Sequence, residues 1–131
     1  MAAEPDDEEY ERVVALSHLK RMLYLHKEVV RTGELWTLAR GEDTLLLGSA
    51  ESPAAVPVWP AERFARAYAE ESETPLRISL DEWLAEWSPR VWEADHQVAV
   101  FPLPGGEAGY ATPEEFEEDL RAARTGPLPL P

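Results

Sequence analysis

Cysteine is absent from the 131 residues of this chain. Its absence excludes disulfide bonds, catalytic thiolates and zinc sites built on cysteine. Asparagine is absent too, Gln97 is the only glutamine and Ile78 the only isoleucine. Few amides and thiols combined with 12 prolines are compatible with a thermophilic source, although a GC-rich genome produces a similar bias.

Long apolar runs are missing as well. No stretch approaches the roughly 18 apolar residues that indicate a membrane-spanning helix. The chain begins with acidic residues, with Glu4, Asp6 and Asp7 close together, whereas a secretory signal needs a basic start followed by an apolar run. We therefore expect a cytoplasmic protein.

Basic residues are scarce relative to acidic ones. The chain has 12 Lys and Arg against 26 Asp and Glu, and its formal net charge is −14. Because phosphate contacts depend on Lys and Arg, this charge argues against nucleic acids and anionic membranes as partners. It permits a basic protein as a partner, since opposite fields accelerate encounter. Solubility is the simplest interpretation of the acidity.

Motifs of known catalytic or ligand-binding centres are not found. The histidines are His18, His26 and His96, and no His-Glu-x-x-His pattern places two of them on one metal. No Gly-x-Ser-x-Gly surrounds a serine. Gly105 and Gly106 lack the strand-to-helix context and the lysine of a phosphate loop. We therefore predict no catalytic, cofactor-binding or metal-binding residues, and the sequence favours a protein that is not an enzyme.

The apolar content predicts one folded domain. Hydrophobic residues make up 44% of the chain, and a chain of this length can bury a substantial core. We predict a single domain over residues 8–124. A flexible acidic arm at 1–7 precedes it, and a loose, proline-rich tail at 125–131 follows it.

Hydrophobic periodicity predicts helices and strands that do not alternate strictly. Spacings of three and four predict helices at 8–30, 61–71, 80–87 and 113–120. Period-two patterns and short apolar runs predict strands at 34–40, 44–48, 56–59, 76–80, 97–101 and 109–111. Residues 49–55 are predicted to be a loop, and Ser88-Pro89 to stop or bend the third helix. This order predicts an α+β fold with about four helices packed on a single layer of antiparallel or mixed sheet.

Two short patterns predict helix starts. Ser79 with Glu82, and Thr112 with Glu115, have the spacing of a capping box, in which each side chain bonds a backbone N–H of the other residue. Pro113 fits the first helical position, where its missing N–H costs nothing.

Tryptophan is the most unusual component, with five residues in a small chain. Five indoles cannot all be fully buried with a partner for each N–H in a core of this size. Core packing is their simplest role, but aromatic residues are also enriched at binding hot spots. Trp59, Trp87 and Trp92 lie next to predicted loops, so we name them as candidates for a partner-binding groove.

Several short strings, taken in order, resemble one family. They are Trp36-Thr37-Leu38, Pro57-Val58-Trp59-Pro60, Ile78-Ser79-Leu80-Asp81-Glu82-Trp83-Leu84, Val100-Phe101-Pro102 and Pro113-Glu114-Glu115-Phe116. Over residues 10–120 the chain resembles a family of small bacterial proteins classed as domain of unknown function 2750. Trp83 stands where a phenylalanine is expected. The resemblance implies a compact α+β domain and brings no activity and no catalytic residues.

Three functional hypotheses follow. The first is a non-enzymatic protein-binding or regulatory module, in the manner of an immunity protein or inhibitor, whose partner is a basic protein. The second is a small enzyme with an unrecognised pocket that uses scattered Glu, His and Arg, such as Arg77 or Arg90. The third is a structural homodimer joined through a strand edge or a tryptophan patch.

Overall fold

The computed structural model describes residues 4–49, 52–105 and 108–124. The helices are α1 (Asp7–Val14), α2 (His18–Thr32), α3 (Glu62–Tyr68), α4 (Leu80–Glu82), the π-helical turn η1 (Trp83–Trp87), α5 (Ser88–Glu93) and α6 (Pro113–Arg124). The strands are β1 (Glu34–Arg40), β2 (Asp43–Thr44), β3 (Leu47–Ser49), β4 (Ser52–Val58), β5 (Thr74–Ser79), β6 (Gln97–Val100) and β7 (Gly109–Ala111). No helix within these ranges has the length and apolar character needed to span a membrane.

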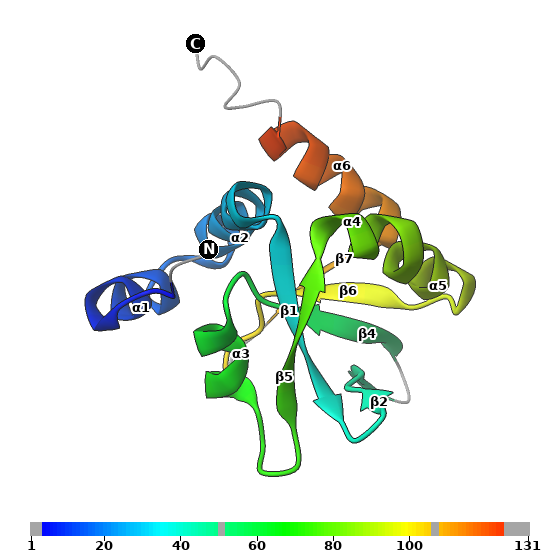
Figure 1. Ribbon diagram of the computed structural model, residues 1–131, viewed down its shortest axis with the longest axis horizontal. Coiled ribbons are helices and arrows are strands. Elements are labelled where there is room, and N and C mark those ends of the chain that lie inside the picture. Colours follow the sequence, from blue (N-terminus) through cyan, green and yellow to red (C-terminus); the bar gives the residue numbers. More distant parts are fainter. Residues whose placement is uncertain (1–3, 50–51, 106–107, 125–131) are drawn as a thin grey trace.

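The strands form two small sheets. One has the order β2-β1-β5 and is antiparallel; the other has the order β3-β4-β6-β7 and is mixed, because β4 and β6 run parallel. Figure 1 shows β1 and β5 crossing the direction of β4 and β6. The prediction of an α+β fold with a mixed sheet is confirmed, but the strands are divided between two sheets and not joined in one layer.

The two sheets are joined where β1 passes the end of β4. Trp36 and Trp59 exchange two backbone hydrogen bonds there, each 2.8 Å long. The Trp59 side chain is fully buried, and its Nε1 donates to the Pro102 carbonyl at 2.9 Å. The Thr37 hydroxyl, also buried, donates to the Pro57 carbonyl at 2.7 Å. These backbone, hydroxyl and Trp59 indole groups are paired, as buried polar groups usually are, whereas the buried Trp36 Nε1 has no hydrogen-bond partner in the described structure.

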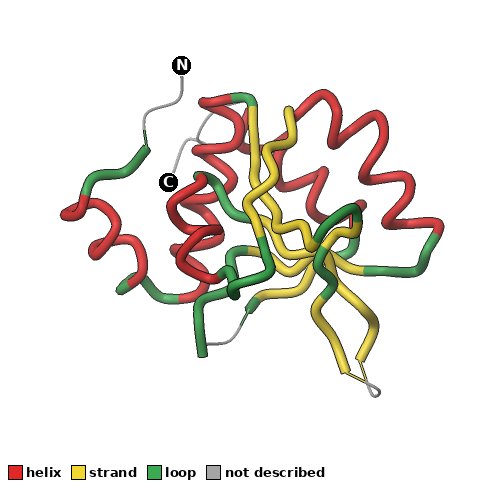
Figure 2. The backbone as a smooth tube through the Cα atoms, turned by 60° about the horizontal axis from the view of Figure 1, so that its bottom comes forward, coloured by secondary structure: helices red, strands yellow, loops and turns green. Residues whose placement is uncertain are grey.

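Helices pack against the strands and against one another. Helix α6 contacts α2, α5, β6 and β7, whereas α3 contacts β1 and β5. Figure 2 shows helices on both sides of the strands. At the centre of the α6 contact, the Phe116 ring packs edge-on against Trp83, with 5.7 Å between ring centroids, and against His26 at 5.9 Å. These contacts hold the start of α6 in place.

The helix predicted over residues 8–30 is in fact two helices. Helix α1 ends at Val14, and α2 begins after Ser17, whose hydroxyl accepts the Lys20 N–H at 3.3 Å. Leu19 and Leu23, in the first turns of α2, are exposed. No glycine or proline marks this break; Ser17 caps the start of α2, and the Arg21 side chain donates to the Leu16 carbonyl at 3.1 Å.

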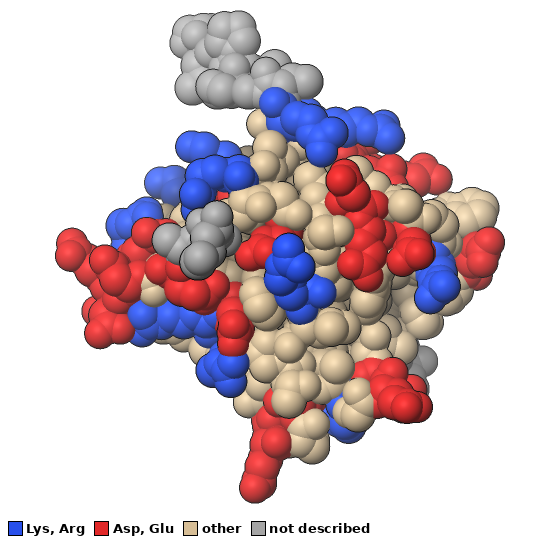
Figure 3. All heavy atoms as spheres, viewed as in Figure 1, with Lys and Arg blue, Asp and Glu red and all other residues tan. Residues whose placement is uncertain are grey.

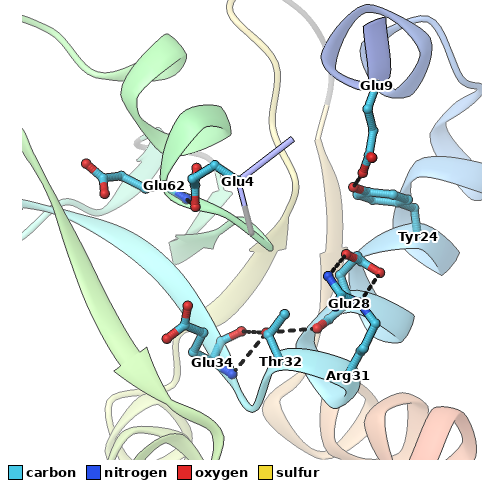
Figure 4. A network of polar contacts seen from close by, with 8 residues as sticks. All are labelled: Glu4, Glu9, Tyr24, Glu28, Arg31, Thr32, Glu34 and Glu62. Carbon is cyan, nitrogen blue, oxygen red and sulfur yellow. Dashed lines mark hydrogen bonds and ion pairs between the residues drawn. The ribbon is translucent and has the colours of Figure 1, made fainter. Parts of the chain in front are cut away.

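Residues 4–7 contact the folded domain. The Glu4 carboxylate accepts the backbone N–H groups of Glu62 and Arg63, at 3.3 and 2.7 Å, at the start of α3 (Figure 4). Pro5 is buried, and α1 is tied to α2 by a 2.5 Å hydrogen bond from Tyr24 to Glu9. Residues 1–3 and the predicted tail at 125–131 lie outside the described residues.

Two further predictions need correction. Residues 49 and 52–55, predicted to be a loop, belong to strands β3 and β4, and the strand predicted at 44–48 is divided between β2 and β3, of which β2 pairs with β1 over two positions. Of the two outcomes predicted for Ser88-Pro89, a stop or a bend, the stop is wrong: the Ser88 N–H bonds the Trp83 carbonyl in η1, and α5 continues beyond the proline. The wide π-helical turn accommodates Pro89, which has no N–H for a regular helical hydrogen bond.

The two predicted capping boxes differ in completeness. At α6, the Thr112 N–H donates to Glu115 Oε1 at 2.9 Å and the Glu115 N–H donates to Thr112 Oγ1 at 3.1 Å. At α4, the Glu82 N–H donates to Ser79 Oγ at 3.0 Å, but the Glu82 carboxylate accepts from Trp87 Nε1 at 3.5 Å. The start of α6 is therefore the better fixed of the two.

Replacing Trp59 with phenylalanine tests the junction. We expect Trp59→Phe to lower the free energy of unfolding by about 1–3 kcal/mol, because the Pro102 carbonyl loses its donor and a small cavity forms. The matched control is Trp92→Phe, at a tryptophan with 61% of its surface exposed, where a change within about 0.5 kcal/mol is expected. Urea unfolding measures both; equal losses in the two variants would contradict the role of Trp59.

Candidate functional site

The structure separates the three tryptophans proposed for a groove. Trp59 is fully buried at the junction of the sheets, so its ring is not part of any surface groove. Trp87 is half-buried and stacks on the buried Trp83 with 6.0 Å between ring centroids. Trp92 is 61% exposed. Trp87 and Trp92 both border hollows in the surface, and the candidate site is built around them.

Trp92 borders two adjacent hollows, of about 370 Å³ and 140 Å³. Both are also lined by Pro113 and Glu114 at the start of α6. We call them together the Trp92 hollow. Its other lining residues are Pro53, Ser88, Pro89, Asp95, His96, Gln97, Thr112 and Glu117. The hollow therefore combines an indole, three prolines and three carboxylates.

The turn from α5 to β6 gives this site its shape. The Asp95 N–H donates to the Trp92 carbonyl at 3.0 Å, and the His96 N–H donates to the Val91 carbonyl at 2.9 Å. Asp95 adopts a left-handed backbone conformation with φ of 60°. Aspartate tolerates this conformation better than most residues. The turn reverses the chain within a few residues, so the end of α5 and the start of β6 border one hollow.

The carboxylates differ in their partners. Glu115 is occupied by the capping box of α6, and Glu117 lies 3.5 Å from Arg121 in an ion pair. Asp95 and Glu114, both exposed, form no ion pair within the described ranges. These two carboxylates are therefore open to a cationic group from outside.

A further hollow, of about 500 Å³, lies beside Trp87, and we call it the Trp87 hollow. It is lined by Asp43, Thr44, Leu46, Val56, Trp87, Arg90, Val91 and His96. His96 lines both the Trp87 hollow and the larger part of the Trp92 hollow. The Trp87 hollow and the Trp92 hollow share His96, and together they make up the candidate surface.

The two arginines proposed for an enzyme have different surroundings. Arg90 lines the Trp87 hollow and has no ion pair among the residues that the structure describes. Arg77 lies on β5, pairs with Glu34 and lines none of these hollows. In the described part of the chain, no three His, Asp or Glu side chains are grouped so that they could hold a metal ion.

His26 is a second unusual group, and it lies inside the fold. It is buried on α2, its Nε2 has no hydrogen-bond partner in the described structure, and the Asp119 carboxylate is 3.8 Å away. Burial lowers the pKa of His26 below its ordinary value, and the nearby Asp119 opposes this shift without cancelling it. His26 therefore belongs to the contact between α2 and α6, where the neutral ring is favoured.

Comparisons with known proteins add one finding. A family model described as a protein of unknown function, DUF2750, matches residues 4–120. No curated protein matches the chain. No solved structure matches it either.

The burial of His26 predicts a pH dependence of stability. Below a pH of about 6.5, the unfolded chain protonates this histidine more readily than the folded chain does. The free energy of unfolding should therefore fall as the pH falls from about 7.5 to about 5.5. His26→Gln should show a smaller fall, whereas His18→Gln, at an exposed histidine, should behave like the natural protein. Urea unfolding across this range measures the effect, and equal falls in all three proteins would contradict it.

Proposed function

This chain belongs to the DUF2750 family, a family of proteins of unknown function, and we propose that it is a non-enzymatic protein-binding module of the cytoplasm. The proposed site is the Trp92 hollow, and its ligand is an extended, basic segment of another protein. The observation that carries the proposal is Trp92 itself: an indole that is 61% exposed stands between two hollows beside free carboxylates.

The apolar part of the hollow supports binding of an extended segment. An exposed tryptophan offers a large rigid surface, and tryptophan is among the residues most enriched at binding hot spots, where truncation costs about 2 kcal/mol or more. Pro53, Pro89 and Pro113 line the hollow around the indole. Proline side chains are already restrained, so little conformational freedom is lost when a ligand covers them.

The charged part of the hollow supports a basic ligand. Asp95 and Glu114 lack ion-pair partners in the described structure. A Lys or Arg of the ligand placed over Trp92 would add a cation–π contact of about 0.5–2 kcal/mol. The net charge of −14 would also accelerate encounter with a basic protein. Covering a basic surface of a partner is how such a module would regulate or inhibit it.

One observation favours a second candidate function, a small enzyme. His96 lines both hollows, with Arg90 on the Trp87 side and Asp95 on the other. A histidine in a concave site beside a cation and a carboxylate is the arrangement that general acid–base chemistry uses. Turnover of a simple ester or phosphoester that His96→Gln abolishes would replace the binding proposal with this one.

The binding proposal is tested with Trp92→Ala. The tagged protein is used to isolate partners from its native host, and each partner is then purified and titrated by calorimetry. We expect Trp92→Ala to weaken the affinity about tenfold or more, because an anchor residue is lost. Charge reversal by Glu114→Lys should weaken it too, and more strongly at low salt than at high salt.

The control is Tyr110→Ala. Tyr110 is a 55% exposed aromatic residue on β7 that lines none of the three hollows. Its removal should leave the affinity unchanged. A partner that binds Trp92→Ala and Glu114→Lys as tightly as the natural protein would refute the proposed site.

A further inference from the structure

Helix α6 carries opposite charges at its two ends. Its first turn is acidic, with Glu114 and Glu115, and its last turn is basic, with Arg121 and Arg124. The acidic end borders the Trp92 hollow through Glu114. Figure 3 shows Lys and Arg side chains gathered over α2 and the end of α6, and acidic side chains over α1 and towards α5. The chain thus presents an acidic hollow and, separately, a basic helix end.

The segment that follows the basic end has a distinctive sequence. Residues 125–131 read Thr-Gly-Pro-Leu-Pro-Leu-Pro, so every second residue from Pro127 onward is a proline. Such a sequence favours the polyproline II helix, which needs little ordering on binding. Proline-rich segments of this kind dock into grooves lined by aromatic side chains. Arg124 stands three residues before the first of these prolines.

We propose that the Trp92 hollow binds residues 124–131 of a second copy of this chain, and that the pairing is reciprocal. This inference rests on the proposed function, since it names the ligand of the same hollow. In it, the Pro-Leu repeat covers Trp92 and the prolines around it, and Arg124 pairs with Glu114 or Asp95. The chemistry of the segment matches both parts of the hollow, apolar and acidic.

Chain length argues that the segment comes from a second copy. The 12 residues of α6 span about 18 Å, and they lead away from the hollow, which lies at the start of the helix. Seven residues in a polyproline II conformation reach about 22 Å. If residues 125–131 folded back along α6 of their own chain, nearly the whole segment would be used to reach the hollow. About one residue would be left to occupy it.

Two copies satisfy this geometry when their α6 helices run in opposite directions. Each basic end then lies at the acidic start of the other helix, and the two equivalent contacts close a symmetric dimer. Repulsion between two copies of charge −14 opposes this pairing at low ionic strength. At about 0.15 M salt, charges more than about 8 Å apart are largely screened. Contacts between apolar groups persist under these conditions.

The test uses a synthetic peptide of residues 121–131 and the full chain. We expect the peptide to bind the natural protein and the Tyr110→Ala control alike. The peptide should bind Trp92→Ala at least about tenfold more weakly than it binds the natural protein. A second peptide that carries Pro127→Ala, Pro129→Ala and Pro131→Ala keeps the arginines and should also bind about tenfold more weakly. Calorimetry at about 0.15 M salt measures these affinities.

Sedimentation of the full chain tests the second copy. The natural protein should form dimers as its concentration rises, whereas Trp92→Ala and a chain that ends at Arg124 should dimerise at least about tenfold more weakly. Failure of the peptide to bind at about 1 mM, or equal dimerisation of the shortened chain, would overturn the inference. Peptide binding without dimerisation would overturn the assignment to a second copy.

Failure of this inference is distinguishable from failure of the proposed function. If the proline-free peptide binds as well as the natural one and Trp92→Ala weakens both, the hollow binds basic segments and only the proline-rich ligand is wrong. If neither peptide binds and Trp92→Ala leaves the affinity of isolated partners unchanged, both proposals are wrong.

Discussion

The fold depends on the place where its two sheets meet. Trp36 and Trp59 exchange both of their backbone hydrogen bonds there, and the indole of Trp59 closes the site by bonding the Pro102 carbonyl. Phe101, which precedes Pro102, has a left-handed backbone conformation with φ of 52°. Its N–H donates to the Val58 carbonyl, and its carbonyl accepts a hydrogen bond from the buried Arg21 side chain. Unpaired polar groups at this depth would be costly, so these bonds determine how the sheets sit together.

The position of the candidate surface follows from that arrangement. Strand β6 leads from the turn at Asp95 and His96 to the junction, and it pairs with β4 on one side and β7 on the other. Helix α6 follows β7, and Phe116 locks its first turns against Trp83. The walls of the Trp92 hollow therefore come from elements held by the core. A ligand would meet side chains on a rigid support, which reduces the entropic cost of binding.

The sequence indicated part of this surface and missed the rest. Trp87 and Trp92 are candidates from the sequence because they lie next to predicted loops and aromatic residues are enriched at binding hot spots. Trp59 also lies next to a predicted loop, but it is buried. Its indole N–H donates to the carbonyl of Pro102, a residue far from it in the sequence. Pro53 and Pro113 gave no sign that they would line the same hollow. Their proximity depends on the parallel pairing of β4 with β6, which no local pattern predicts.

Local chemistry in the sequence determined the α+β class, the acidity, most element positions and the capped start of α6. These features depend on residues within a few positions of one another, such as Thr112 and Glu115. Tertiary structure decided the division into two sheets, the exposure of Leu19 and Leu23, and which tryptophan reaches solvent. These features depend on contacts between distant segments. The free energy of such contacts outweighs local preference, and a single sequence does not show which segments will meet.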